Sequence, residues 1–403
     1  MSCLGVSVRR SVLLTALPAM LALVVAHVLG RDRTWTHEWV WAHYQYGFVT
    51  VLLGPLVAGL AAWDGLRLSR SRFLLGTGDR TLAALVVTWA GAAAWAIVAY
   101  LGGLALVVTM VKVAGTPGWP STVAVRASVP AAGLLLAEAA AGVVTGWWLR
   151  HALAAPAAAL GCFLTTLWMY QSGPGELVVV GGATSSLVNL APRLSMQVLQ
   201  VLWYATAVVA LLVAAARTAG WGRRPGSWQM PAALCLSVAA LVPLLQHGEV
   251  YLVTTTDPQV CVGTHPTVCV APGYAPEARA TRQALLPYLA ALRAIAAPVP
   301  DTFRQNVEPG QQRVGPLQDR LILGDRHQAG FAVLAAYLSQ KCPVDADAHL
   351  QAALTGLAWW LYATVDGERT PDPTVPAVLQ GAPSAQQARW LTDAVRTLQG
   401  CAG

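Results

Sequence analysis

Charged residues are scarce in this chain. They make up 11% of its 403 residues, whereas soluble domains carry about 25%. Lysine is nearly absent, with two residues against 24 arginines. Such a composition excludes a disordered chain, a coiled coil and an ordinary cytosolic enzyme.

Several catalytic and nucleotide-binding motifs are also missing. The sequence has no Walker A motif, so we expect no ATP hydrolysis at a P-loop of this chain. It has no H-E-x-x-H, G-x-S-x-G or C-x-x-C motif either. We therefore expect a protein that is not an enzyme and that holds no cofactor, no metal ion and no nucleic acid.

Long apolar segments are what the sequence has in abundance. Hydrophobic residues make up 56% of the chain, and the mean hydropathy is +0.52. A membrane-spanning helix needs about 20 apolar residues. Seven segments qualify: Ser11–Leu29, Gly47–Trp63, Leu82–Met110, Ala127–Leu149, Ala152–Tyr170, Met196–Ala216 and Gln229–Gln246.

The charge distribution divides the chain in two. Residues 1–246 carry 15 basic and 6 acidic side chains, and residues 247–403 carry 11 basic and 13 acidic ones. We expect a polytopic α-helical membrane domain with about seven transmembrane helices over 1–246. A small extracytoplasmic α+β domain is expected over 247–403.

Basic residues in the short loops predict the orientation. With a cytoplasmic N-terminus, ten Arg or Lys residues lie inside and five outside, as the positive-inside rule requires. We expect a multi-pass protein of the cell (inner) membrane, whose C-terminal domain lies outside.

The cysteines also indicate that the C-terminal domain lies outside the cytoplasm. The back part holds four cysteines, Cys261, Cys269, Cys342 and Cys401, and disulfides persist in oxidising compartments. Residues 259–270 read as a β-hairpin that places Cys261 opposite Cys269, which favours a disulfide. A metal site formed with His265 is the alternative, although no fourth ligand is evident nearby.

Four amphipathic helices are expected after the hairpin, around residues 285–296, 331–338, 350–361 and 388–398. Cys342 ends the second helix and Cys401 ends the fourth, so a second disulfide is expected between them. A further strand is expected within Arg313–Leu323.

Glu138 is the candidate functional residue inside the membrane. It occupies the middle of the fourth apolar segment, where a carboxylate costs at least about 2.5 kcal/mol. Such a residue indicates a functional site by default. A protonated carboxyl group that is hydrogen-bonded within the protein is the alternative.

The loop after the second apolar segment carries Arg67, Arg70, Arg72 and Arg80. The first three have the spacing of a short surface helix, although the positive-inside rule alone would also place arginines there.

Leu53–Arg80 resembles the second span and following cytosolic helix of type 2 ABC exporter permeases, in their actinobacterial versions. Gly142–Pro156 is similar to the hairpin between spans four and five of that family, and Gly173–Ser195 occupies the place of its re-entrant helical pair. Val260–Pro300 resembles the outer domains of some actinobacterial permease-like proteins. A seventh span and an outer domain depart from the usual six-span permease.

The resemblance implies a permease subunit of an export system. A separate ATPase subunit would dock on Arg67, Arg70, Arg72 and Arg80, and the subunit would work in the bilayer as a homodimer or heterodimer. The second hypothesis is a permease-derived scaffold or sensor whose outer domain binds a ligand or partner. The third is a membrane-anchored outer peptidase, against which the missing zinc motif argues.

Overall fold

The computed structural model describes residues 3–71, 79–171, 181, 186–218, 252–305, 314–336, 348–367, 374–381 and 384–400. Internal contacts divide the chain into two compact units. The first comprises Met1–Ala114, Gly118–Thr184 and Leu190–Thr254, and the second comprises Gly115–Pro117, Ser185–Asn189 and Thr255–Gly403.

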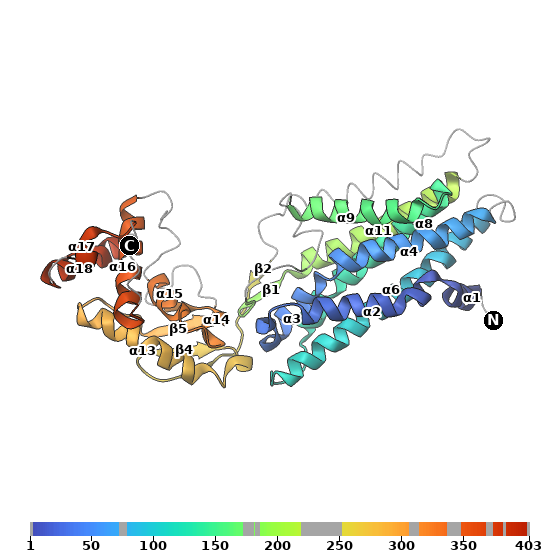
Figure 1. The fold of residues 1–403 in the computed structure, drawn as a ribbon. Helices are drawn as coiled ribbons and strands as arrows, with labels where there is room; N and C mark the ends of the chain where they lie inside the picture. The colour runs from blue at the N-terminus through green and yellow to red at the C-terminus, as the bar shows by residue number, and fades with distance from the viewer. Residues whose placement is uncertain are drawn as a thin grey trace. The chain divides into compact units, whose positions relative to one another are not determined.

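The first unit is a bundle of apolar helices (Figure 1). Its helices are α1 (Cys3–Arg10), α2 (Val12–Leu29), η1 (Arg33–His37), α3 (Trp39–Gly47), α4 (Thr50–Arg70), α6 (Asp79–Val113), α7 (Thr122–Ala127), α8 (Val129–Leu149), α9 (Ala154–Gln171) and α11 (Leu194–Thr218). A short antiparallel pair joins β1 (Leu190–Pro192) to β2 (Leu252–Thr254).

Five helical stretches among the described residues are long and apolar enough to cross a membrane: Val12–Leu29, Thr50–Arg70, Asp79–Val113, Thr122–Leu149 and Leu194–Arg217. Ala154–Trp168 in α9 is a shorter apolar helix. Six of the seven expected segments therefore coincide with helices. The seventh, Gln229–Gln246, lies outside the described residues.

The turn between α8 and α9 is short, since α8 ends at Leu149 and α9 begins at Ala154. The backbone of Arg150 adopts a left-handed conformation with φ 53°, and its N–H donates to the carbonyl oxygen of Gly146. This geometry ends α8 and reverses the chain, and α9 begins at Ala154.

The second unit combines a small sheet with helices. A four-stranded sheet has the order β3 (Val260–Val262), β4 (Thr267–Val270), β5 (Thr302–Gln305) and β6 (Val314–Leu317). The helical elements are η2 (Pro272–Tyr274), α13 (Ala278–Ala294), α14 (Asp319–Ile322), α15 (Gln328–Ala335), α16 (Ala348–Val365), α17 (Ala377–Gly381) and α18 (Ser384–Gly400).

The expected hairpin is present. Strands β3 and β4 are antiparallel, Cys261 pairs with Cys269 in the register, and the two cysteines form a disulfide. Closing so short a loop stabilises a fold by about 2 to 3 kcal/mol in the chain-entropy model. Cys342 and Cys401 lie outside the described residues.

The four expected amphipathic helices of this unit correspond to α13, α15, α16 and α18. Their apolar faces join the strands in one core, which includes Phe303, Leu289, Leu357 and Leu398. The expected strand within Arg313–Leu323 is shorter than that range, since it ends at Leu317 and α14 follows. Strand β5 was not anticipated, and it pairs in parallel with both β4 and β6.

Candidate functional site

Glu138 lies in the interior of the helical bundle. It belongs to α8, and only 5% of its surface is exposed. The hydroxyl of Thr166 on α9 lies near its carboxylate, but neither Glu138 oxygen has a hydrogen-bond partner of acceptable geometry among the described residues. An acidic side chain buried in this way is costly, which makes it the strongest candidate for a functional group in the bundle.

Gly54 on α4 provides the space for this side chain. A Cβ atom built on Gly54 would lie 1.8 Å from Oε2 of Glu138, so any larger residue would displace the carboxylate. The missing side chain of Gly54 therefore leaves the space that the carboxylate occupies.

Small residues hold α4 and α8 together around this point. A Cβ atom on Gly142 would lie 2.2 Å from the carbonyl oxygen of Ala58, and one on Gly146 would lie 1.9 Å from that of Ala62. Small residues four apart let two membrane helices approach until their backbones touch. On α4, positions 54, 58 and 62 face positions 138, 142 and 146 of α8 in the same order. The two helices therefore run parallel, and their contact fixes Glu138 at the interface.

Two further helices enclose the carboxylate. Cys162 on α9 and Tyr204 on α11 both interact electrostatically with Glu138. The ring of Tyr204 also packs on Gly133 of α8, and its hydroxyl is buried without a hydrogen-bond partner among the described residues. Glu138 therefore lies among four helices, α4, α8, α9 and α11.

The buried face of α11 is divided into a polar and an apolar half. Gln197, Gln200 and Tyr204 are buried on its N-terminal half, at helical spacings of three and four residues that place them on one face. Val208, Leu212 and Ala215 continue the same face and are apolar. This spacing is a signal that the sequence alone already contains.

A second buried carboxylate lies at the far end of α4. Asp64 accepts hydrogen bonds from the hydroxyl of Ser11 at 2.6 Å and from the backbone N–H of Val12 at 3.2 Å. Ser11 is the N-cap of α2, so Asp64 stabilises the first turn of that helix. This residue was not recognised from the sequence, because its partners lie 52 and 53 positions away.

Arg67 takes part in the same contact. Its Nη1 donates to the carbonyl oxygen of Arg10 at 3.0 Å and lies 3.7 Å from Oδ1 of Asp64. Arg67 and Arg70 have the helical spacing that the sequence indicates, but they belong to the last turn of α4, which continues unbroken to Arg70. Arg70 and Arg80 are exposed, and Arg72 lies outside the described residues.

His43 is a buried histidine outside the apolar spans. Its Nδ1 lies 3.2 Å from the hydroxyl of Ser128, which itself donates to the carbonyl oxygen of Val125. Nδ1 therefore carries the proton and donates to Ser128. Burial lowers the pKa of His43 to about 4, so this histidine is neutral at pH 7.

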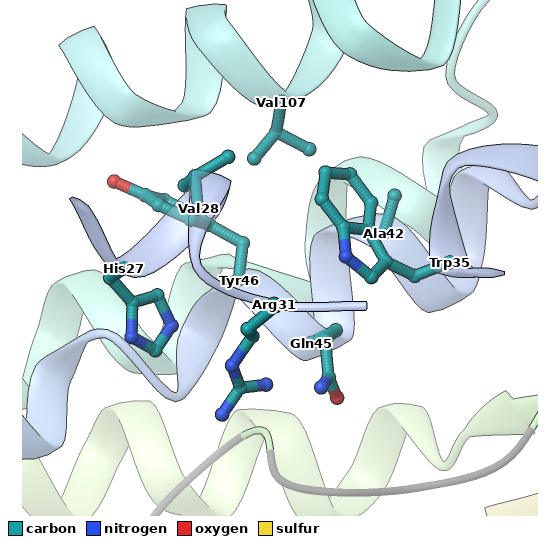
Figure 2. A pocket seen from close by; sticks show the side chains of 8 residues that line it. All are labelled: His27, Val28, Arg31, Trp35, Ala42, Gln45, Tyr46 and Val107. Carbon is teal, nitrogen blue, oxygen red and sulfur yellow. The ribbon is translucent and has the colours of Figure 1, made fainter. Parts of the chain in front are cut away.

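A shallow pocket lies near one end of α2 (Figure 2). Side chains from α2, η1, α3 and α6 line it, and they include His27, Arg31, Trp35 and Gln45. Its volume is about 10 Å³, which is roughly what one water molecule needs. The pocket is therefore too small for an organic ligand in this conformation.

In the part of the chain that the structure describes, no three His, Cys, Asp or Glu side chains lie together as a metal site would require. No protein-family model, curated protein or solved structure matches this chain.

Proposed function

We propose that the chain is the membrane-spanning, permease-like subunit of an ABC-type export system, energised by a separate ATPase. The observation that carries the proposal is Glu138, a buried carboxylate between four apolar helices that has no hydrogen-bond partner of acceptable geometry among the described residues. A helix that only anchors a domain in the membrane does not require a buried carboxylate. In transport proteins, ionisable groups at this depth mark the path of a substrate or an ion.

The proposal includes seven spans, a cytoplasmic N-terminus and an outer C-terminal domain. It is supported by the excess of basic residues in alternate loops and by the Cys261–Cys269 disulfide, which suits an oxidising compartment. In this orientation the end of α4 that carries Arg67 and Arg70 lies in the cytoplasm.

Arg70 and Arg80 are the residues best placed to meet the ATPase. Both are exposed, and guanidinium groups suit acidic grooves on a partner protein. Arg67 is less free to do so, because it already contacts Arg10 and Asp64. We expect the coupling surface to include Arg72 and to be used by a homodimer or heterodimer of such subunits.

The test reverses Arg70 and Arg80 to glutamate in the full-length chain. We expect ATPase recovered with the affinity-purified protein to fall at least about tenfold, since the reversal replaces two attractions with two repulsions. The control is Arg33→Glu, which changes an exposed arginine in η1 and should leave recovery unchanged.

Topology is checked in the same variants with reporter fusions after Gly226 and Gly403, because lost inside charge can alter membrane insertion. Undiminished ATPase recovery in a correctly inserted Arg70→Glu/Arg80→Glu variant would contradict the proposed docking surface.

The alternative is a permease-derived scaffold or sensor, and one feature of the second unit favours it. The exposed ring of His327 stacks on Tyr362 at 4.5 Å between centroids, and Tyr288 donates to the exposed carboxylate of Asp366 at 2.6 Å. His327 and Asp366 thus expose an imidazole and a carboxylate beside the half-buried ring of Tyr362, and such polar groups suit capture of a ligand or partner. If no ATPase accompanies the unmutated protein, the sensor function becomes the better account.

A further inference from the structure

We infer that Glu138 is a reversible proton-binding site, reached from the end of the bundle at which Arg126 and Gln197 lie and closed from the other end. This inference rests on the proposed function and names the ion that the buried carboxylate handles.

The surroundings of Glu138 favour a proton over calcium or magnesium ions. Calcium and magnesium ions require six or more oxygen ligands at defined distances. Around Glu138 the described side chains offer one carboxylate and the hydroxyl groups of Thr166 and Tyr204, and α4 contributes the bare backbone of Gly54. A proton needs no further ligand and makes the buried carboxyl group neutral, which removes the cost of an isolated charge.

Among the described residues, few other ionisable groups act on this site. Tyr204 faces it from α11 and Cys162 faces it from α9, and both are neutral when protonated. On α4, the acidic residue Asp64 is ten positions from Gly54 and is occupied with Ser11 and Val12. On α6, Tyr100 donates to the carbonyl oxygen of Ser128, ten residues before Glu138. Glu138 is thus the group that gains or loses charge when the site binds or releases a proton.

Polar side chains lead to Glu138 from one direction. Gln197 donates to the carbonyl oxygen of Arg126 at 3.2 Å, and its own Oε1 is buried without a partner among the described residues, as is Nε of Arg126. Gln200 and Tyr204 continue this line along α11. Buried polar atoms such as Oε1 of Gln197 and Nε of Arg126 are the positions at which water enters protein interiors.

The opposite direction is closed by direct packing. Beyond Glu138, Gly142 and Gly146 lie against the backbone of α4, and the indole of Trp147 donates to the carbonyl oxygen of Ala215 on α11. Val208 and Leu212, which precede Ala215 on the same face of α11, are buried and apolar. A proton can therefore enter and leave through the polar half alone until the helices move.

Proton binding is tested with dicyclohexylcarbodiimide on the full-length protein in native membranes. The reagent takes the proton of a neutral carboxylic acid on one nitrogen while the carboxylate oxygen bonds to its central carbon, and the adduct is located by peptide mass mapping. We expect Glu138 to be labelled at least ten times more than Asp64, whose carboxylate is paired. Labelling should fall as the pH is raised and should vanish in Glu138→Gln.

Access is tested with a charged, membrane-impermeant thiol reagent on oriented vesicles. The variants are Gln200→Cys on the polar half of α11 and Leu212→Cys on the apolar half. Val125→Cys, an exposed position in α7, and Arg70→Cys define the two membrane faces. We expect Gln200→Cys to react from the same face as Val125→Cys and at least ten times faster than Leu212→Cys.

Equal labelling of Glu138 and Asp64, labelling of Glu138 that does not change with pH, or reaction of Gln200→Cys from the face of Arg70→Cys would overturn the inference. Neither experiment needs an ATPase or a transported substrate. A failure of ATPase co-purification would therefore refute the proposed function without affecting these results.

Discussion

Replacing Gly142 and Gly146 together with alanine should destabilise the helical bundle by about 4 kcal/mol, near 2 kcal/mol for each overpacked site. Each added Cβ atom would meet a backbone carbonyl oxygen of α4, at 2.2 Å for Gly142 and 1.9 Å for Gly146. Because backbone atoms cannot rotate away as a side chain can, α4 and α8 must separate. The melting temperature of the purified protein in detergent measures the loss.

Gly161→Ala is the matched control. Gly161 lies in α9, an apolar helix like α8, but an added Cβ atom there would meet no described atom within 4 Å outside its own stretch of helix. Alanine is the better helix former by about 1 kcal/mol, so this variant should melt at the parent temperature or slightly above it. A double variant at 142 and 146 that melts with the parent protein would contradict the close approach of α4 and α8.

Replacing Asp64 with alanine should cost about 2 to 3 kcal/mol of stability, since a charged cap and its hydrogen bonds are lost together. The hydroxyl of Ser11 and the N–H of Val12 would lose their acceptor, and Arg67 would lose the carboxylate that lies 3.7 Å away. Asp64→Asn keeps one acceptor oxygen and should lie between the parent protein and Asp64→Ala.

Asp79→Ala serves as the control for Asp64→Ala. Asp79 is an exposed acidic residue in the first turn of α6, and exposed substitutions of this kind change stability by about 0.5 kcal/mol or less. Thermal melts of Asp64→Ala, Asp64→Asn and Asp79→Ala in the same detergent measure these losses of stability. Equal melting temperatures for Asp64→Ala and Asp79→Ala would mean that Asp64 does not hold the start of α2.

The sequence located the helices well because burial in a bilayer demands long apolar runs. Six of the seven expected segments are helices in the structure, from α2 to α11. The hairpin around Cys261 and Cys269 was also predicted correctly, because turn residues and alternating valines are local signals.

Contacts between distant residues could not be predicted in the same way. The bond between Asp64 and Ser11 spans 53 positions, and no periodicity reports it. Strand β5 was missed because it has a single core hydrophobic residue, Phe303, which fits over Gly315 on β6. The other buried side chain of β5 is that of the polar residue Gln305, whose Oε1 accepts a hydrogen bond from the N–H of Ala271.

The candidate site was predicted in part. The depth of Glu138 in its apolar segment was enough to single it out. Three other features depend on which helices are neighbours: the lack of a hydrogen-bond partner for Glu138 among the described residues, the facing Gly54 and the polar half of α11. The arginine cluster was clear from the sequence, but its contacts were not. Arg67 donates a hydrogen bond to the carbonyl oxygen of Arg10 within the chain.

The most direct test of the proposed function is affinity purification of the full-length, unmutated chain from its native membranes, followed by measurement of ATP hydrolysis and identification of the bound subunits. The chain has no P-loop of its own, so hydrolysis at a P-loop would come from a partner. We predict a stoichiometric ATPase subunit and ATP hydrolysis that follows the complex through gel filtration. A pure complex without an ATPase and without ATP hydrolysis would contradict the assignment as an export subunit.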